Sequence, residues 1–175
     1  MNLKINNSHN IVAPQNHGDA GYDIIAASQP KITGDIWMAN LYKSISYIEY
    51  DTAVQFDFQD AWGEYEFYAN VFPRSSVSKY NLLLCNSVGV IDSGYKNSIK
   101  LRFKYIYQPE DIRTIKNNDG DLVSLTSINK EKIYQKGDKI GQIIFSKHNL
   151  IKIEGMNDNK KRTKRNMGGF GSTGS

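Results

Sequence analysis

Hydrophobic and polar residues alternate in one clear stretch of the chain, which is the pattern of a β-strand with one buried face. In residues 97–107, NSIKLRFKYIY, apolar side chains alternate with basic or polar ones. Segments rich in β-branched and aromatic residues predict further strands at residues 45–50, 53–58, 63–72, 81–85, 121–128 and 140–146. No stretch keeps a helical period beyond a turn or two. The sequence therefore predicts an all-β fold, a barrel or jelly roll.

Turn-forming residues divide these segments. Asn117-Asn118-Asp119-Gly120 is typical of a tight hairpin turn. One short helix is expected at about residues 75–80, directly after Arg74. The chain shows no internal repeat and no domain boundary. We therefore expect one β domain over residues 1–156, followed by a flexible, basic, glycine-rich arm over residues 157–175.

The composition fits one domain with a hydrophobic core, because 39% of the 175 residues are hydrophobic. No apolar run approaches the roughly 20 residues that span a bilayer, and the start MNLKINNSHN lacks a secretory signal, so we expect a cytoplasmic protein with no membrane partner. Cys85 is the only cysteine of the chain, so an intrachain disulfide is excluded and a reducing compartment is indicated. Cys85 is expected in the core. His9, His17 and His148 lie too far apart for metal-ligand spacing and receive no role.

Positive charge gathers near the end of the chain. The formal net charge is +4, and residues 160–165 are mostly basic. The glycine-rich segment 168–174 follows, in which backbone N–H groups can surround an anion and Phe170 offers a face for a ring. A solvated linker, a disordered tail and a weak nucleic-acid patch are the alternatives. The combination favours an arm that closes over a ligand with phosphates and a ring.

Pro73-Arg74-Ser75-Ser76 predicts an anion site at the start of the short helix. Pro73 ends a strand, Ser75 can cap the helix, and free backbone N–H groups then lie beside Arg74. Taken alone, a capped helix start with a surface arginine is common.

Residues 86–95, NSVGVIDSGY, predict a hairpin that ends on Asp92 and Tyr95. Its open end would expose backbone donors and acceptors to the edge of a base. Asp92 can polarise a water as a general base, and Tyr95 can pack under a sugar. The alternative is an ordinary Asx turn.

Two further segments are loop-to-strand junctions. Ala20-Gly21-Tyr22-Asp23 starts a strand with a carboxylate, and residues 136–142, KGDKIGQ, lead into another strand. Each segment is unremarkable alone, but together with the others they form an ordered set along one β domain.

This ordered set resembles the trimeric all-β dUTP pyrophosphatases, or dUTPases. The family's motifs have counterparts in AGYD at 20–23, PRSS at 73–76, NSVGVIDSGY at 86–95, GDKIGQ at 137–142 and RNMGGFGSTG at 165–174. The resemblance implies a dUTPase-like β-barrel or jelly roll that hydrolyses dUTP to dUMP and pyrophosphate. Such an activity supports dTMP synthesis and keeps uracil out of DNA.

The resemblance also implies a role for each matching residue. Asp92 would activate water for attack on the α-phosphorus, and Tyr95 would stack on deoxyribose and exclude ribose, so UTP and dTTP are expected to be poor substrates. The expected uracil contacts are Asn86, Val90, Ile91, Lys100 and the stacked Phe170. The expected phosphate ligands are Arg74, Ser75, Ser76, Gln142, Arg165, Gly171, Ser172 and Thr173. Asp23 would contact Mg²⁺ through water, while the triphosphate itself chelates the ion.

The family's assembly implies a homotrimer in which the arm of one subunit acts on a neighbour's site. Insertions of about 28–72, with Trp37, Trp62 and many tyrosines, and of about 104–136 exceed the family's minimum. Extra length in the second stretch resembles phage-type dUTPases, which suggests a phage or viral protein in a host cytoplasm. Aromatic residues expected to be exposed in both insertions could dock a regulatory protein, with the nucleotide as the switch.

The chain departs from the family pattern at a few positions. Gly94 replaces an acidic residue, Lys96-Asn97 replaces Arg-Gly, and Asn166 replaces a glycine. Gly94 could loosen the turn that aims Asp92. The dCTP deaminases, a rival on the same fold, need an Ala-His pair and a Glu that residues 88–102 lack. Specific binding of nucleic acid is not expected.

Overall fold

The computed structural model describes residues 3–58, 67–149, 151 and 153–155 of the chain. Their regular structure consists of β-strands and short 3₁₀ helices, which confirms the all-β prediction. The strands are β1 (Lys4–Asn6), β2 (Ile11–Val12), β3 (Tyr22–Ile25), β4 (Lys31–Met38), β5 (Leu41–Asp51), β6 (Gln55–Asp57), β7 (Phe67–Phe72), β8 (Leu82–Leu84), β9 (Gly89–Ile91), β10 (Lys100–Tyr105), β11 (Ile112–Lys116), β12 (Leu122–Ser127) and β13 (Lys139–Lys147). The 3₁₀ helices are η1 (Ser8–Asn10), η2 (Ser75–Lys79), η3 (Pro109–Asp111) and η4 (Lys130–Lys132).

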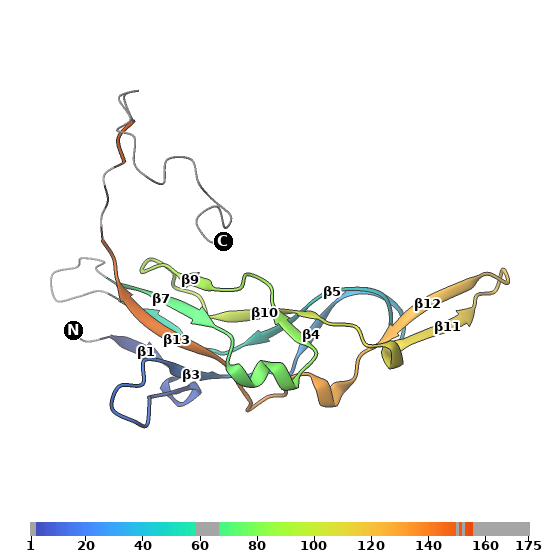
Figure 1. Ribbon diagram of the computed structural model, residues 1–175, viewed down its shortest axis with the longest axis horizontal. Helices are drawn as coiled ribbons and strands as arrows, with labels where there is room; N and C mark the ends of the chain where they lie inside the picture. Colours follow the sequence, from blue (N-terminus) through green and yellow to red (C-terminus); the bar gives the residue numbers. More distant parts are fainter. Residues whose placement is uncertain (1–2, 59–66, 150, 152, 156–175) are drawn as a thin grey trace, which may run out of the picture.

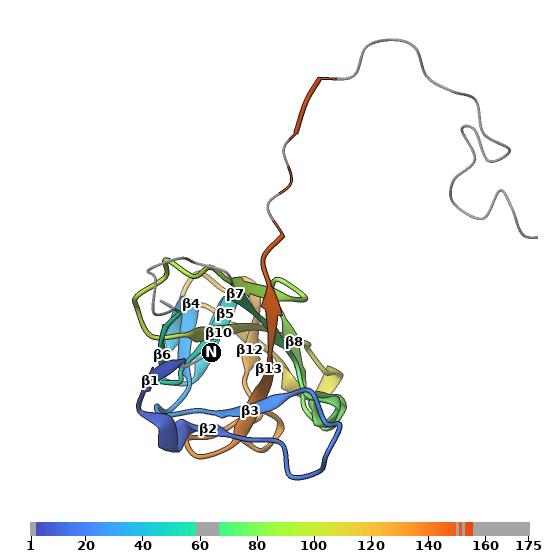
Figure 2. The ribbon, with the colours of Figure 1, turned by 90° about the vertical axis from the view of Figure 1, so that its left-hand side faces the viewer.

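Two antiparallel sheets and one short ladder build the fold. One sheet has the order β11-β12-β5-β10-β8, with β4 paired to β5, and the other has the order β2-β3-β13-β7-β9, while β1 pairs with β6. Seen along the length of the molecule, these strands surround a common interior (Figure 2). The most deeply buried core side chains include Ile24, Ile48, Tyr50, Val54, Phe103, Ile140 and Ile143. No helix in the part of the chain that the structure describes is long and apolar enough to cross a membrane.

The alternation seen in the sequence is confirmed in β10. Leu101, Phe103 and Tyr105 are buried, and the basic residues between them are exposed. The same alternation corrects one prediction, because Leu84 is buried and the next residue, Cys85, is exposed. Successive side chains of an extended chain point to opposite faces, so Cys85 does not lie in the core.

The prediction of exposed aromatic residues between positions 28 and 72 is wrong for those described, because each of them is buried or half-buried. Tyr42, Tyr50, Phe56 and Phe58 are buried. The rings of Phe56 and Phe58 meet edge to face with centroids 5.4 Å apart. Antiparallel pairing of β5 with β10 directs one face of β5, with Tyr50, into the core, and Phe56 and Phe58 add core volume from β6 and the residue after it. Trp62 lies outside the described residues.

The short helix predicted after Arg74 is present as the 3₁₀ helix η2. Its N-cap is Arg74 rather than Ser75, and no side chain caps it. The N–H groups of Val77 and Tyr80 donate to the carbonyls of Arg74 and Val77, which is the tighter 3₁₀ pattern. The prediction of a Ser75 cap is therefore wrong.

Residues 86–95 differ from the predicted hairpin. β9 pairs with β7, whose Asn70 faces Val90, while β8 pairs with β10 in the other sheet. Among the described residues, no ladder joins the two halves of this segment to each other. β13 occupies one side of β7 and leaves the other side for β9, so the segment crosses from one sheet to the other.

The hairpin β11–β12 extends away from the strands that surround the core (Figure 1). Its turn is the predicted one. The Asn117 side-chain oxygen accepts hydrogen bonds from the N–H groups of Asp119 and Asp121 at 3.0 and 2.8 Å. Gly120 adopts φ +86°, a conformation that favours glycine. The predicted arm, residues 157–175, lies outside the described residues.

Candidate active site

Asp23 is the centre of a charged cluster at the junction of β3, β13 and the end of β7. Its Oδ1 lies 2.9 Å from Arg74 Nε, and its Oδ2 lies 2.9 Å from Lys139 Nζ. Gln142 Nε2 donates to Oδ1 at 3.2 Å. These four residues, the Asp23 cluster from here on, carry one negative and two positive charges. The cluster therefore has a net positive charge that suits an anionic ligand.

The backbone brings the Asp23 cluster together in two ways. Asp23 and Gln142 are direct partners in the β3–β13 ladder, and an irregularity between Lys139 and Gly141 shifts the register of β13. Residues three apart on a regular strand point to opposite faces, so this bulge lets both Lys139 and Gln142 reach Asp23. Gly21 also lies close, since a Cβ there would be 3.2 Å from Gln142 Cδ.

The cluster keeps Asp23 ionised. Burial alone would raise its pKa, but hydrogen bonds from Lys139 and Gln142 and the charge of Arg74 outweigh burial and lower the pKa below the usual 3.8. The cluster lines an opening of about 570 Å³ together with residues of the 12–21 loop. A charged wall beside an open volume of this size can accept a polyphosphate.

The two predicted serine ligands lie at the start of η2, next to Arg74. Ser75 is exposed and Ser76 is half-buried. Both serines therefore lie beside Arg74 of the Asp23 cluster, although neither is among the residues that line the opening of the cluster.

A second pocket, the β9 pocket, lies between β9 and the strands β8 and β10. Its volume is about 230 Å³. The predicted uracil contacts Asn86, Val90, Ile91 and Lys100 all line it, together with the apolar side chains of Val71, Leu84, Ile99 and Leu101. β9 is the last strand of its sheet, so one side of its backbone is available to hydrogen-bond a ligand. An apolar slot with one amide and a free strand edge suits a planar polar ring.

Asp92 follows β9 directly and is exposed. It lines a third opening, of about 530 Å³, which also includes Val90, Tyr68 and His148. Val90 lines both this opening and the β9 pocket, so the opening that Asp92 lines adjoins that pocket. The Tyr95 N–H donates to the Asp92 carbonyl at 3.0 Å, which joins the two predicted residues through one turn.

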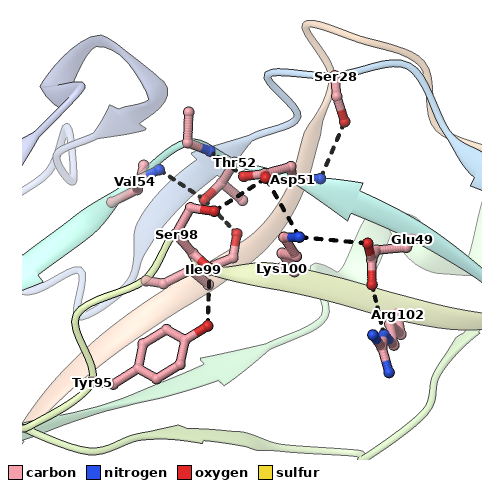
Figure 3. Close-up of polar contacts among 11 residues, drawn as sticks. Ser28, Glu49, Asp51, Thr52, Val54, Tyr95, Ser98, Ile99, Lys100 and Arg102 are labelled. Atoms are coloured by element: carbon pink, nitrogen blue, oxygen red, sulfur yellow. Dashed lines mark hydrogen bonds and ion pairs between the residues drawn. The ribbon is translucent and has the colours of Figure 1, made fainter.

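A polar network on β5 and β10 (Figure 3) includes Lys100 and Arg102, which line the β9 pocket. Arg102 Nε lies 2.7 Å from Glu49 Oε2, and the pKa of Arg102 is raised mainly by this hydrogen bond. Lys100 Nζ lies 3.8 Å from Glu49 Oε1 and 3.9 Å from Asp51 Oδ2. The cations beside the β9 pocket are thus paired with two acids of β5.

The structure brings the sequence-predicted residues into neighbouring but separate groups. Asp23, Arg74 and Gln142 meet in the Asp23 cluster, and the predicted uracil contacts meet in the β9 pocket. Asp92 and Tyr95 lie at the turn after β9. Arg165, Phe170, Gly171, Ser172 and Thr173 lie outside the described residues. Within one chain, the cluster and the β9 pocket line different openings.

Sequence reasoning missed Lys139, Glu49 and Asp51. Lys139 stands inside the GDKIGQ motif, but the bulge that turns it toward Asp23 leaves no mark in the residue pattern. For the acidic residues of β5, the sequence did contain a signal that could have identified them. Glu49 and Asp51 alternate opposite the bases of β10, and the ladder pairs Asp51 with Lys100.

The donor set limits how a metal could bind. Among the described residues, no group of three or more His, Cys, Asp or Glu could hold a metal ion. The Asp23 carboxylate has about four acceptor positions. Gln142 donates to Oδ1 and Lys139 pairs with Oδ2, while Arg74 Nε forms an ion pair with Oδ1 without a hydrogen bond. One position on Oδ2 is left for the hydrogen bond of a metal-bound water, so the cluster fits a divalent ion whose other ligands come from a bound molecule.

Comparisons of the chain with family models and with curated proteins indicate the same family. The dUTPase family model matches residues 7–119. The deoxyuridine 5'-triphosphate nucleotidohydrolase of Escherichia phage T5 is 32% identical over 127 residues, which cover 71% of this chain and 67% of the relative. The protein of the same name from Rickettsia conorii is 30% identical over 157 residues, which cover 89% of this chain and 82% of the relative.

Solved structures of phage dUTPases share the fold. The dUTPase of Staphylococcus bacteriophage 80alpha with dUPNHPP matches with a TM-score of 0.63 and 22% identity over 99% of both chains, and is described under phage dUTPases that control the transfer of virulence genes. A mutant dUTPase of the S. aureus phage phi11, described with a structural Mg(II) ion, matches with a TM-score of 0.56 and 20% identity over 91% of this chain and 99% of that one.

Proposed function

Because this chain belongs to the dUTPase family and is a dUTP diphosphatase, we propose that it cleaves dUTP between the α- and β-phosphates to give dUMP and pyrophosphate. The observation that carries this proposal is the convergence of Asp23, Arg74 and Gln142, from three distant segments, on one cationic cluster. A triphosphate needs such countercharge, and the separate β9 pocket suits its base.

Asp92 is the proposed general base. Its exposed carboxylate takes a proton from a water molecule as the water oxygen attacks the α-phosphorus. The bond from the α-phosphorus to the bridging oxygen breaks, and pyrophosphate leaves with the electron pair. Phosphoryl chemistry of this kind depends on alignment and charge neutralisation more than on a covalent enzyme intermediate. The opening that Asp92 lines adjoins the β9 pocket, which supports this role.

The nucleoside is proposed to bind at the β9 pocket. The Asn86 amide and the free edge of β9 at Val90 and Ile91 would bind the polar edge of uracil, with Lys100 as a further contact. The Tyr95 ring would stack on deoxyribose and leave no room for a 2′-hydroxyl. Tyr95 is 39% exposed and its hydroxyl donates to the Ser98 carbonyl at 3.1 Å, so its ring is both accessible and anchored.

The phosphates are proposed to lie against the Asp23 cluster and the start of η2. The proposed ligands there are Arg74, Ser75, Ser76 and Gln142. Mg²⁺, when bound with the triphosphate, neutralises phosphate charge, and the free acceptor position of Asp23 would receive a hydrogen bond from water on the ion. Arg165, Phe170 and residues 171–173 of the arm are proposed to close over the nucleotide.

A homotrimer is the proposed assembly. The Asp23 cluster and the β9 pocket line different openings of one chain, and a site built from several subunits would unite the cluster of one with the pocket of another. The arm would then reach a neighbour's site.

A panel of nucleotides tests the proposed function. With Mg²⁺ present, we expect pyrophosphate release from dUTP and little from UTP or dTTP, because Tyr95 excludes the 2′-hydroxyl and the pocket leaves no space for a 5-methyl group. Ammonia release from dCTP, which would indicate a deaminase, is expected to be absent. Equal turnover of UTP and dUTP would contradict the proposed specificity.

A second proposed function is the docking of a regulatory protein. Large apolar side chains are exposed at the end of the molecule formed by β4, β11 and β12: Ile36 by 58%, Met38 by 59%, Ile112 by 51% and Leu122 by 70%. Such a surface, outside the openings described above, suits a protein partner. This proposal concerns only the 104–136 stretch and the tip of β4, because the aromatic residues described in the first insertion are buried or half-buried.

A further inference from the structure

The link between β5 and β6 anchors the segment that carries Tyr95 (Figure 3). Thr52 donates from its backbone N–H and its Oγ1 to the Ile99 carbonyl at 3.1 and 2.8 Å. The Ile99 N–H donates to the Val54 carbonyl at 2.9 Å. Thr52 is fully buried and Ile99 is 1% exposed, so water does not compete for these bonds. Residues 51–54 thus fix the end of the 95–99 segment.

Asp51 extends this anchor to Tyr95. The Ser98 hydroxyl donates to Asp51 Oδ2 at 3.1 Å, and the Tyr95 hydroxyl donates to the Ser98 carbonyl at 3.1 Å. The position of the Tyr95 ring therefore depends on where Ser98 is held. The backbone bonds of Ile99 hold one side of Ser98, and the Asp51 carboxylate holds its side chain.

Asp51 is itself fixed in place. Its Oδ1 accepts a hydrogen bond from the Ala53 N–H at 2.7 Å, and its own N–H donates to Ser28 Oγ at 3.2 Å. Ala53 has φ 56°, a left-handed conformation that costs energy for alanine and that this hydrogen bond helps to stabilise. The carboxylate thus points toward Ser98 from a rigid turn.

The Asp51 carboxylate also contacts Lys100, which is another of the proposed nucleoside contacts. Asp51 Oδ2 lies 3.9 Å from Lys100 Nζ, and Lys100 lines the β9 pocket. Asp51 itself is not among the lining residues. It can therefore influence a bound nucleoside only through Ser98, Tyr95 and Lys100.

We propose that Asp51 is a positioning residue that sets the preference for deoxyribose over ribose by fixing the Tyr95 ring through Ser98. This inference rests on the proposed function, in which Tyr95 stacks on the sugar. Removal of the Asp51–Ser98 bond lets the ring move away from the sugar, which makes room for a 2′-hydroxyl and weakens contact with deoxyribose.

The test compares kcat/KM for dUTP and UTP in Asp51→Ala, Ser98→Ala and the double variant. Each single variant is expected to lower the dUTP/UTP ratio by about tenfold, mainly through KM, since a lost packing contact is worth 10–200-fold in selectivity. The double variant should lose no more than Asp51→Ala alone, because Asp51→Ala already removes the bond that Ser98→Ala breaks. Asp51→Asn, which keeps a hydrogen-bonding group beside Ser98, should restore most of the ratio.

Asp35→Ala, the same change at an exposed site on β4, is the matched control and should keep the wild-type ratio. Thermal unfolding identifies the folded variants, and Ser98→Ala carries the test if Asp51→Ala does not fold. An unchanged ratio in the folded variants, or additive losses in the double variant, would overturn the inference. Tyr95→Ala distinguishes failure of the proposed function from failure of this inference. If Tyr95→Ala leaves the dUTP/UTP ratio unchanged, the proposed stacking of Tyr95 on the sugar is wrong. If Tyr95→Ala alone lowers the ratio, only the role of Asp51 is wrong.

Discussion

At the scale of single residues, the chemistry of the site depends on how charges are paired. Asp23 holds the two cations of the proposed phosphate site, and Glu49 and Asp51 hold two more that line the β9 pocket. Such pairs orient long flexible side chains before a ligand arrives, which reduces the entropy lost on binding. The acids are therefore as much a part of the site as the bases.

The Asp23 cluster makes a prediction about stability and pH. The pKa of Asp23 is lower in the folded chain than its ordinary value of 3.8. A carboxyl of this kind stabilises the fold above the unfolded pKa, and the contribution is lost as pH falls through the lower folded pKa. We expect Asp23→Asn to reduce the free energy of unfolding near pH 7, and the difference from wild type to shrink below about pH 3.

Urea denaturation at the two pH values measures this difference. Asp119→Asn, in the exposed turn between β11 and β12, is the matched control and should show little difference at either pH. A difference for Asp23→Asn that is as large in acid as at neutral pH would contradict the account.

The sequence grouped four residues that the structure brings to one pocket, but it did not indicate the residues that surround them. Asn86, Val90, Ile91 and Lys100 line one pocket as the resemblance implied, although their roles stay predictions. Cys85 was wrongly assigned to the core, because a run of apolar residues in a predicted strand does not indicate which face of the sheet each side chain lies on. The support from Glu49 and Asp51 depends on the register of β5 and β10, which local pattern does not specify.

At the scale of elements, alternation predicted β10, and β-branched and aromatic residues predicted β5, β6, β7, β8, β12 and β13, because both are local signals. The pairing of β9 with β7 was not predicted, because a free sheet edge about 20 residues away in the sequence is a property of the fold. The bulge in β13 was missed for the same reason. Elements that owe their form to distant partners were thus the least predictable.

The β11–β12 hairpin provides the element-scale prediction. Replacement of residues 114–124 by a short glycine-serine turn should leave dUTP turnover within about threefold of wild type, because the hairpin extends away from all three openings described above. Pyrophosphate release measures the turnover, with thermal unfolding as the check on folding. A folded variant without activity would place the hairpin in the catalytic machinery.

At the scale of the whole molecule, the separation of the Asp23 cluster from the β9 pocket is the main structural argument for shared sites. If each site takes its arm from a neighbour, two inactive chains can complement each other. A chain truncated after Met167 keeps Asp92, and an Asp92→Asn chain keeps its arm. Mixed trimers of the two should regain part of the wild-type activity, while each variant alone has little.

Co-expression with different affinity tags yields the mixed trimers, and pyrophosphate release measures their turnover. Truncation is expected to leave thermal unfolding nearly unchanged. Full activity of the truncated chain alone would show that the arm is dispensable, and absence of complementation in mixed trimers would contradict sharing of the site.

The most direct test of the account is the effect of Asp92→Asn on turnover and binding of dUTP, with Asp119→Asn as control. Loss of a general base should lower kcat by about 10²–10⁴-fold, while calorimetry shows dUTP affinity close to wild type, because the asparagine preserves size and polarity. Turnover within tenfold of wild type would contradict Asp92 as the base and with it the proposed mechanism.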